Sequence, residues 1–157
     1  MHFFNTEGPN RPELHYTIPP LTRWDLEAVL ELIAQQKYFL LHAPRQTGKT
    51  SCLLALMELL NRDGRYRAAY ANIETAQPAR EDVALAMADI VQGIAAAGAR
   101  LLGDSSLPAR AREVLAANAP TRALEQFLAA WSAADNRPLV LLLDEVDALI
   151  GDTLLSL

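Results

Sequence analysis

Three residues with complementary chemistry, Gly48, Lys49 and Thr50, stand together between two apolar segments, residues 38–43 and 53–60. Glycine can adopt a positive φ and leaves room for phosphate groups, while the lysine ammonium group neutralises their charge. The threonine hydroxyl is a ligand that Mg²⁺ accepts. If a strand precedes this turn and a helix follows it, the first N–H groups of the helix also bind the anion. The spacing therefore predicts a loop that holds a polyphosphate; an incidental Gly-Lys-Thr turn is the alternative.

An acidic pair, Asp144 and Glu145, follows a third apolar segment, residues 139–143. Open parallel sheets bind ligands beyond the carboxyl ends of their strands, which is also where the first segment delivers its loop. We therefore expect Asp144 to hold the water shell of Mg²⁺. Glu145 is expected to orient or deprotonate a water that attacks the γ-phosphate. The alternative is an acidic pair that only ends a strand or caps a helix.

The first position of the loop departs from the usual phosphate-loop pattern. Residues 43–50 fit G-x-x-x-x-G-K-[ST] except at the start, where Ala43 replaces glycine. This replacement strains the loop if residue 43 needs a positive φ, and costs little if its φ is negative.

Taken together, the two motifs resemble the Walker A and Walker B elements of P-loop NTPases. The glutamate beside the aspartate resembles the branch with an additional catalytic glutamate, which includes AAA+ and STAND ATPases. More narrowly, "APRQTGKTS" is similar to the Arg-Gln-x-Gly-Lys-[Ser/Thr]-Ser loop of bacterial AAA-like ATPases. The stretch "LLLDEVDAL" is similar to the Asp-Glu-x-Asp strand end of initiator-like AAA+ ATPases. The resemblance spans about residues 16–152.

This resemblance implies a role for each motif residue. Glu145 is the implied catalytic base and Lys49 the second catalytic residue, while Thr50 and Asp144 bind Mg²⁺. The residues implied to bind the nucleotide cofactor are Pro44, Arg45, Gln46, Thr47, Gly48, Lys49, Thr50 and Ser51. The three residues before Gly48 would contribute mainly backbone N–H groups. The implied cofactors are ATP and Mg²⁺.

The elements that must position these residues alternate along the chain. Short apolar segments predict strands at 38–43, 66–74 and 139–144. Apolar residues at helical spacing predict helices at about 22–36, 48–60, 83–102, 109–117, 120–131 and 147–157. Strands separated by helices imply a parallel sheet covered on both faces, so the predicted class is α/β. The first helix is expected to begin at Thr22, with Asp25 completing a capping box.

The resemblance also implies how the chain is organised. The glycine and prolines of residues 1–21 indicate an extended lead-in. The resemblance implies that residues 22–157 form an incomplete P-loop ATPase domain, a three-layer α/β/α fold with a parallel sheet. A helical insertion at about 79–136 explains the long separation between Lys49 and Asp144. The family's sheet has a further strand between its two motif strands, which comes later in the chain. We therefore expect this chain to be the N-terminal part of a longer protein, with ATP hydrolysis a property of the intact protein.

The composition limits the partners and the compartment. The 157 residues are 51% hydrophobic with a net charge of −5 and a pI near 5.1, so the basic surface typical of nucleic-acid-binding modules is not indicated. The single cysteine, Cys52, rules out an internal disulfide and fits a reducing compartment. We find neither a leader pattern nor an apolar stretch of about 18 residues, so we expect a cytoplasmic protein without a membrane span.

Other residues keep two interpretations. Tyr16, Ile18 and Pro19 precede the first helix where related ATPases bring the chain past the adenine. They form either an apolar slot for the base or packing of the lead-in. His42 is interpreted as a core histidine rather than a ligand, and Cys52 as buried and inert.

Two functions fit these observations. The first is Mg²⁺-dependent ATP binding, with hydrolysis in the intact protein coupled to a conformational change. The alternative is a non-hydrolysing, nucleotide-dependent switch or assembly module. The expected partners are ATP and ADP, with self-association or protein partners acting through a C-terminal part.

Overall fold

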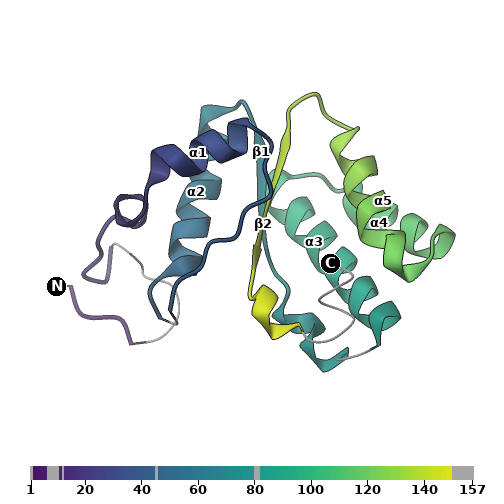
Figure 1. Cartoon of the computed structure of the whole chain (residues 1–157), viewed down its shortest axis with the longest axis horizontal. Helices are drawn as coiled ribbons and strands as arrows, with labels where there is room; N and C mark the ends of the chain where they lie inside the picture. The colour runs from purple at the N-terminus through teal and green to yellow at the C-terminus, as the bar shows by residue number, and fades with distance from the viewer. Residues whose placement is uncertain (1, 7–10, 12, 45, 80–81, 150–157) are drawn as a thin grey trace. The chain divides into compact units, whose positions relative to one another are not determined.

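The structure, a computed structural model, describes residues 2–6, 11, 13–44, 46–79 and 82–149 (Figure 1). The chain forms two compact units, Met1–Leu59 and Leu60–Leu157. The helix α2, Lys49–Asp63, begins in the first unit, and its last turn belongs to the second.

The first unit starts with an irregular segment. Its residues Phe3 and His15 form an isolated parallel bridge, and the Tyr16 N–H donates to the Phe3 carbonyl at 3.1 Å. A 3₁₀ turn, η1, Pro20–Arg23, then precedes the helix α1, Leu26–Ala34. The apolar residues of α1 at helical spacing include the buried Val29 and Ile33, which explains why this segment forms an amphipathic helix.

The start of α1 corrects the sequence prediction that Thr22 is the helix cap. The N-cap is Asp25, whose carboxylate accepts a hydrogen bond from the Ala28 N–H at 3.1 Å. The Thr22 hydroxyl instead donates to the Pro19 carbonyl at 2.8 Å. Because proline fixes its own φ and favours a first helical turn, Pro20 starts a separate 3₁₀ turn, and α1 begins only after it.

The segment 38–43 is not a strand, so this sequence prediction was wrong. No backbone hydrogen bond joins it to another described segment. Tyr38 and Leu40 are exposed, with relative accessibilities of 106% and 81%. A buried strand needs hydrogen-bonded neighbours for its backbone groups. The apolar composition of the segment predicts burial. It does not indicate whether another strand lies beside the segment to accept and donate its backbone hydrogen bonds.

The second unit contains a parallel two-stranded sheet. The strand β1, Arg67–Asn72, pairs with β2, Leu139–Asp144. The first residues of the two strands lie opposite each other, and so do their last residues, Asn72 and Asp144. Both strands lie within the segments that the sequence predicts as strands, and parallel pairing requires a long crossover between them.

A side chain closes part of the edge of β1 that faces away from β2. The Asn61 amide nitrogen donates to the Ala68 carbonyl at 2.8 Å, and the Asn61 carbonyl oxygen accepts from the Ala68 N–H at 2.8 Å. This amide therefore makes the same pair of hydrogen bonds that another strand would make. Such blocking limits unwanted pairing at a sheet edge.

Helices form the crossover between the two strands (Figure 1). In chain order the elements are η2, Glu74–Ala79; α3, Val83–Leu102; α4, Leu107–Ala117; α5, Pro120–Ser132; and η3, Val146–Ala148 after β2. The predicted helices at 83–102, 109–117 and 120–131 are confirmed with these bounds. Most of the helix predicted at 147–157 lies outside the described residues.

The helix α3 is the centre of the core of the second unit. It starts at the N-cap Asp82, whose carboxylate accepts from the Leu85 N–H at 3.0 Å, and ends at Gly103, which has a φ of 69°. The core joins its buried face to one face of the sheet and to α5; prominent members are Met87, Ile90, Val91, Ile94, Ala69, Ala71, Phe127 and Trp131. Side chains alternate across a strand, so Ala69 and Ala71 share this face.

Among the described residues, α3 alone has the length and composition of a membrane span, with a mean hydropathy of 1.4. Of that window, 44% is buried inside the structure, against the sheet and the neighbouring helices. The buried residues of α3 form the centre of the core of the second unit.

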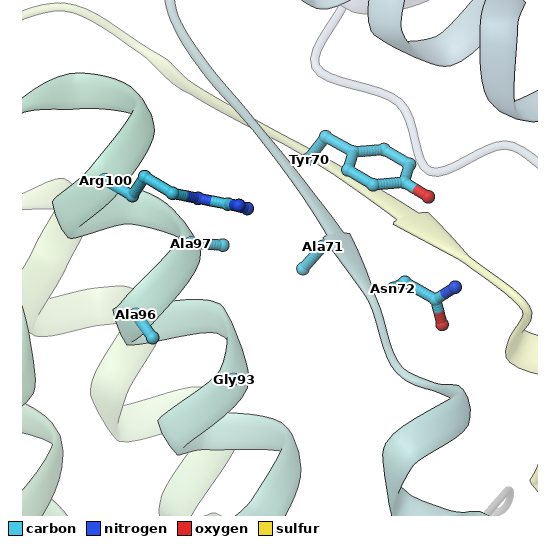
Figure 2. A pocket seen from close by; sticks show the side chains of 7 residues that line it. All are labelled: Tyr70, Ala71, Asn72, Gly93, Ala96, Ala97 and Arg100. Carbon is cyan, nitrogen blue, oxygen red and sulfur yellow. The ribbon is translucent and has the colours of Figure 1, made fainter. Parts of the chain in front are cut away.

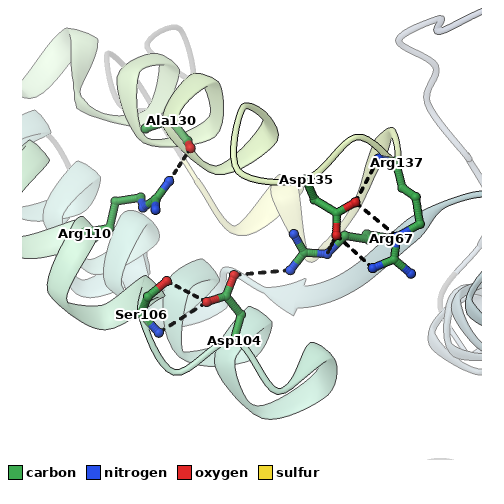
Figure 3. A network of polar contacts seen from close by, with 7 residues as sticks. All are labelled: Arg67, Asp104, Ser106, Arg110, Ala130, Asp135 and Arg137. Carbon is green, nitrogen blue, oxygen red and sulfur yellow. Dashed lines mark hydrogen bonds and ion pairs between the residues drawn. The ribbon is translucent and has the colours of Figure 1, made fainter.

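A polar network surrounds Arg67 at the start of β1 (Figure 3). Its guanidinium group is 3.2 Å from the Asp104 carboxylate and 3.6 Å from the Asp135 carboxylate. Arg137 binds the same Asp135 carboxylate at 2.8 Å. Hydrogen bonds from Ser106 and then from Arg67 lower the pKa of Asp104, and those from Arg137 lower the pKa of Asp135. The network ties the start of β1 to the segments after α3 and before β2.

These elements confirm a mixed helical and parallel-strand architecture, as expected for part of an α/β fold. The three-layer arrangement stays a prediction, and so do the domain boundaries at residues 21 and 22 and the insertion at about 79–136.

Candidate functional site

The loop before α2 is closed by its own polar side chains. The Lys49 ammonium nitrogen donates to the Ala43 carbonyl at 3.0 Å and lies 3.5 Å from the Pro44 carbonyl. The Thr47 hydroxyl donates to the same Pro44 carbonyl at 2.7 Å. Lys49 therefore spans the loop from its end to its beginning. Arg45, a predicted phosphate-binding residue, lies outside the described residues.

Two left-handed residues bend this loop. Gln46 has a φ of 60° and Gly48 has a φ of 81°. Outside glycine, the described residues with positive φ are Gln36, Gln46 and Glu145, so Ala43 has the negative φ that suits an L-residue. The replacement of the first glycine by alanine is therefore tolerated without backbone strain.

The first turn of α2 leaves backbone donors available. Within the part of the chain that the structure describes, the N–H groups of Thr47, Gly48, Lys49 and Ser51 make no backbone hydrogen bond, whereas the Cys52 N–H donates to the Gly48 carbonyl at 3.0 Å. The N–H groups at the start of a helix have no intrahelical acceptor and carry the positive end of the helix dipole. This end of α2 is thus suited to an anion.

An arginine that the sequence reasoning missed lies against the loop. A Cβ built on Gly48 would be 2.6 Å from Nη1 of Arg23, so a larger residue here would have to displace this guanidinium group. The turn that carries Arg23 is held to α2 by the Cys52 thiol, which donates to the Pro20 carbonyl at 3.3 Å. Burial raises the pKa of that thiol, and the nearby Arg23 charge opposes the shift. No spacing rule links residue 23 to residue 48.

In the second unit, the carboxylate of Asp144 is held at both oxygens. The Tyr70 hydroxyl donates to Oδ2 at 3.0 Å, and the Glu145 N–H donates to Oδ1 at 3.0 Å. Asp144 is 5% exposed, at the carboxyl end of β2. A buried carboxylate needs such donors because it has lost its hydration. Tyr70 is a second residue that the motif analysis missed.

Glu145 has an unusual backbone conformation. Its φ of 58° and ψ of 34° place it in the left-handed region, which non-glycine residues rarely adopt. It follows β2 directly and starts the turn η3. Strained residues of this kind persist where the surrounding structure holds them, and they are frequent at functional sites.

An open pocket lies between β1 and α3. It is lined by Tyr70, Ala71 and Asn72 of the strand and by Gly93, Ala96, Ala97 and Arg100 of the helix (Figure 2). The predicted site residues do not line it. Asn72, which ends β1 beside Asp144, uses its side-chain oxygen to accept from the Glu74 N–H at 2.8 Å, so it stabilises the turn after the strand.

The predicted site residues fall into two groups, one in each unit. The described loop residues and Lys49, Thr50 and Ser51 belong to the first unit, and Asp144 and Glu145 belong to the second. The role predicted for each residue stays a prediction. The meeting of the two groups at one nucleotide remains a prediction as well.

One comparison with known proteins gives a match that covers most of the chain. A model of the AAA ATPase domain family matches residues 23–155, which include the loop, the acidic pair and Arg23. Neither the curated proteins nor the solved structures contain a match to this chain.

Proposed function

Because the chain belongs to the AAA ATPase domain family, we propose that it binds Mg²⁺-ATP through its loop and its acidic pair. We further propose that the intact protein hydrolyses ATP and couples the reaction to a conformational change. Membership of this family supports nucleotide binding and ATPase activity. The dependence on Mg²⁺, the role of each residue and the coupling are the proposal.

The closed loop is the observation that carries the proposal. The Lys49 ammonium group donates to the Ala43 carbonyl at 3.0 Å, so the loop already curves around this ammonium group. Gly48 has a positive φ and lies against the Arg23 guanidinium group. N–H groups that make no backbone hydrogen bond among the described residues, together with two cations around a tight loop, favour a phosphate chain.

The donor set also fits Mg²⁺. The Thr50 hydroxyl and the Asp144 carboxylate are hard oxygen ligands of the kind that Mg²⁺ prefers. Within the described residues no group of three or more histidine, cysteine, aspartate or glutamate side chains forms a metal cage. Mg²⁺ often binds one or two protein ligands and takes the rest from phosphates and water. When bound, the ion neutralises charge that develops on the phosphates.

The residues of the chain then have separate roles in hydrolysis. The Lys49 ammonium group exchanges the Ala43 carbonyl for phosphate oxygens, and the loop N–H groups hold the remaining oxygens. The Glu145 carboxylate accepts a proton from the attacking water. The oxygen of that water bonds to the γ-phosphorus as the bond to ADP breaks and ADP leaves. Asp144 keeps its carboxylate fixed by two hydrogen bonds throughout.

Binding of a fluorescent ATP analogue to the 157-residue chain, with and without Mg²⁺, tests the nucleotide site. Lys49→Ala should abolish saturable binding. The chain has one other lysine, Lys37, which is exposed, so Lys37→Ala is the matched control. Equal binding by Lys49→Ala and Lys37→Ala would overturn the assignment of the loop.

Turnover is tested in the intact protein with Glu145→Gln. This variant should retain nucleotide binding and lose steady-state phosphate release, while Glu113→Gln on the exposed face of α4 should behave as wild type. Full phosphate release by Glu145→Gln would refute its role as the base. Wild-type protein that retains nucleotide without turnover would instead favour the switch.

Three expectations accompany this proposal. The protein is proposed to be cytoplasmic, to bind ATP and ADP as its small-molecule partners, and to associate with itself or with other proteins through a C-terminal part. Composition gives no support for nucleic-acid binding by this stretch.

A further inference from the structure

The Tyr70 hydroxyl is aimed at the carboxylate that the proposed function assigns to Mg²⁺. Its oxygen lies 3.0 Å from Oδ2 of Asp144, and the Glu145 N–H lies 3.0 Å from Oδ1. One donor comes from β1 and the other from the residue after β2, and they bind different oxygens. Rotation of the carboxylate about its Cβ–Cγ bond would break both hydrogen bonds, so its plane is fixed.

The register of the sheet creates this contact. Tyr70 lies opposite Leu142, so Asp144 is two residues further along the neighbouring strand and on the same face of the sheet. A diagonal neighbour at this separation is within reach of an aromatic side chain but not of a short one. Figure 2 shows the Tyr70 ring extending away from α3, whereas Ala71 points toward α3.

Packing alone does not account for a tyrosine at this position. Tyr70 is only half-buried, and its ring lies on the face of β1 opposite the alanines that pack against α3. A phenylalanine would supply the same ring. The hydroxyl is the part that distinguishes tyrosine, and the Asp144 carboxylate is its hydrogen-bond acceptor.

We propose that Tyr70 is a positioning residue that holds the Asp144 carboxylate in the orientation needed to bind hydrated Mg²⁺. This inference rests on the proposed function, because it assigns Asp144 to the metal. A carboxylate oxygen has two lone pairs, so one oxygen can accept a hydrogen bond from the protein and another from a ligand water. Residues that orient a metal ligand contribute about 10- to 100-fold to metal affinity.

The test compares Tyr70→Phe with Tyr66→Phe in the complete chain. Tyr66 is a matched control because it precedes the same strand and its ring contacts Arg65, 5.7 Å from the ring centre, rather than the acidic pair. Two quantities are measured with a fluorescent ATP analogue. The first is its affinity in EDTA, and the second is the Mg²⁺ concentration that gives half of the Mg²⁺-dependent change in binding.

Tyr70→Phe should raise the half-saturating Mg²⁺ concentration about tenfold and leave the affinity in EDTA within about twofold of wild type. A general loss of structure would lower both affinities, so the two measurements separate positioning from folding. An unchanged Mg²⁺ midpoint in folded Tyr70→Phe would overturn the inference. If wild type and Lys49→Ala bind nucleotide equally in EDTA, the proposed function itself has failed.

If Tyr70→Phe does not fold, two phenylalanine derivatives at position 70 separate the effect of the hydrogen bond from that of the ring. p-Aminophenylalanine retains a hydrogen-bond donor, whereas p-methylphenylalanine has a similar size and lacks one. The amino variant should keep a Mg²⁺ midpoint near that of wild type, and the methyl variant should raise it about tenfold. Equal midpoints for the two variants would count against Tyr70 as a positioning residue.

Discussion

Two glycines of α3 should respond in opposite directions to the same substitution. A Cβ on Gly93 meets no atom within 4 Å, whereas a Cβ on Gly98 would lie 2.6 Å from Leu107 Cδ1 and 2.7 Å from the Trp131 ring. Leu107 and Trp131 are both 0% exposed, so neither can relieve the clash by a small shift into solvent. The helix backbone is the same at both sites, and only the surroundings differ.

The magnitudes follow from two terms. Replacing glycine by alanine inside a helix stabilises it by about 0.5–1 kcal/mol, so Gly93→Ala should raise the free energy of unfolding by that amount. Gly98→Ala gains the same helix term, but overpacking a closed core costs about 1–3 kcal/mol. The free energies of unfolding of the two variants should therefore differ by about 1–3 kcal/mol, with Gly98→Ala the less stable.

Urea unfolding followed by circular dichroism at 222 nm measures both free energies. Trp131 fluorescence in a Trp24→Phe background reports the contact itself, because these are the two tryptophans of the chain. Leu107→Val shortens the side chain that the new methyl group would meet. In a double-mutant cycle, this substitution should therefore couple favourably to Gly98→Ala. If Gly98→Ala stabilises the protein as much as Gly93→Ala, the packing of α3 against α4 and α5 is wrong.

Two further predictions concern the loop and the polar network. Gly48→Ala and Gly64→Ala each place alanine at a φ near +80° and should each cost about 1–2 kcal/mol in urea unfolding. Only Gly48→Ala, whose Cβ would meet Arg23, should also weaken nucleotide binding; equal effects on binding would contradict the loop geometry. Because Arg137, with Arg67 adding a smaller effect, lowers the folded pKa of Asp135, the unfolded chain binds its proton more tightly. The stability from this network is therefore present above about pH 4 and is lost as pH falls further. Arg137→Met should flatten this acid-side loss in melting temperature between pH 6 and pH 3, and an unchanged profile would show that the Arg137–Asp135 pair does not contribute.

Local patterns predicted the helices of the second unit well. The spacing of Met87, Ile90, Val91 and Ile94 indicates one continuous apolar face, and Gly103 marks the end of that helix. These features depend on residues within a few turns of each other, so they are readable without the fold. The same is true of β1 and β2, whose apolar segments are bounded by turn residues.

Local patterns failed where a neighbour decides the outcome. Residues 38–43 are apolar enough for a strand, yet no described strand pairs with them. Thr22 has the chemistry of a helix cap, but the proline before it starts a separate turn and leaves the cap to Asp25. In both cases the chemical character of the residues was interpreted correctly. The hydrogen-bond partners that these residues have in the fold were not predicted.

For the candidate site, the sequence by itself determined the residue types of the phosphate loop and of the acidic pair, together with the ATPase family they indicate. Those residues are neighbours in the chain, so their spacing carries the information. Only the tertiary structure placed Arg23 against Gly48 and the Tyr70 hydroxyl against the Asp144 carboxylate. Each of these contacts joins residues far apart in the chain, and turn packing or strand register creates it. Periodicity along the sequence encodes which residues share a face, but the pairing of distant elements is decided when the chain packs.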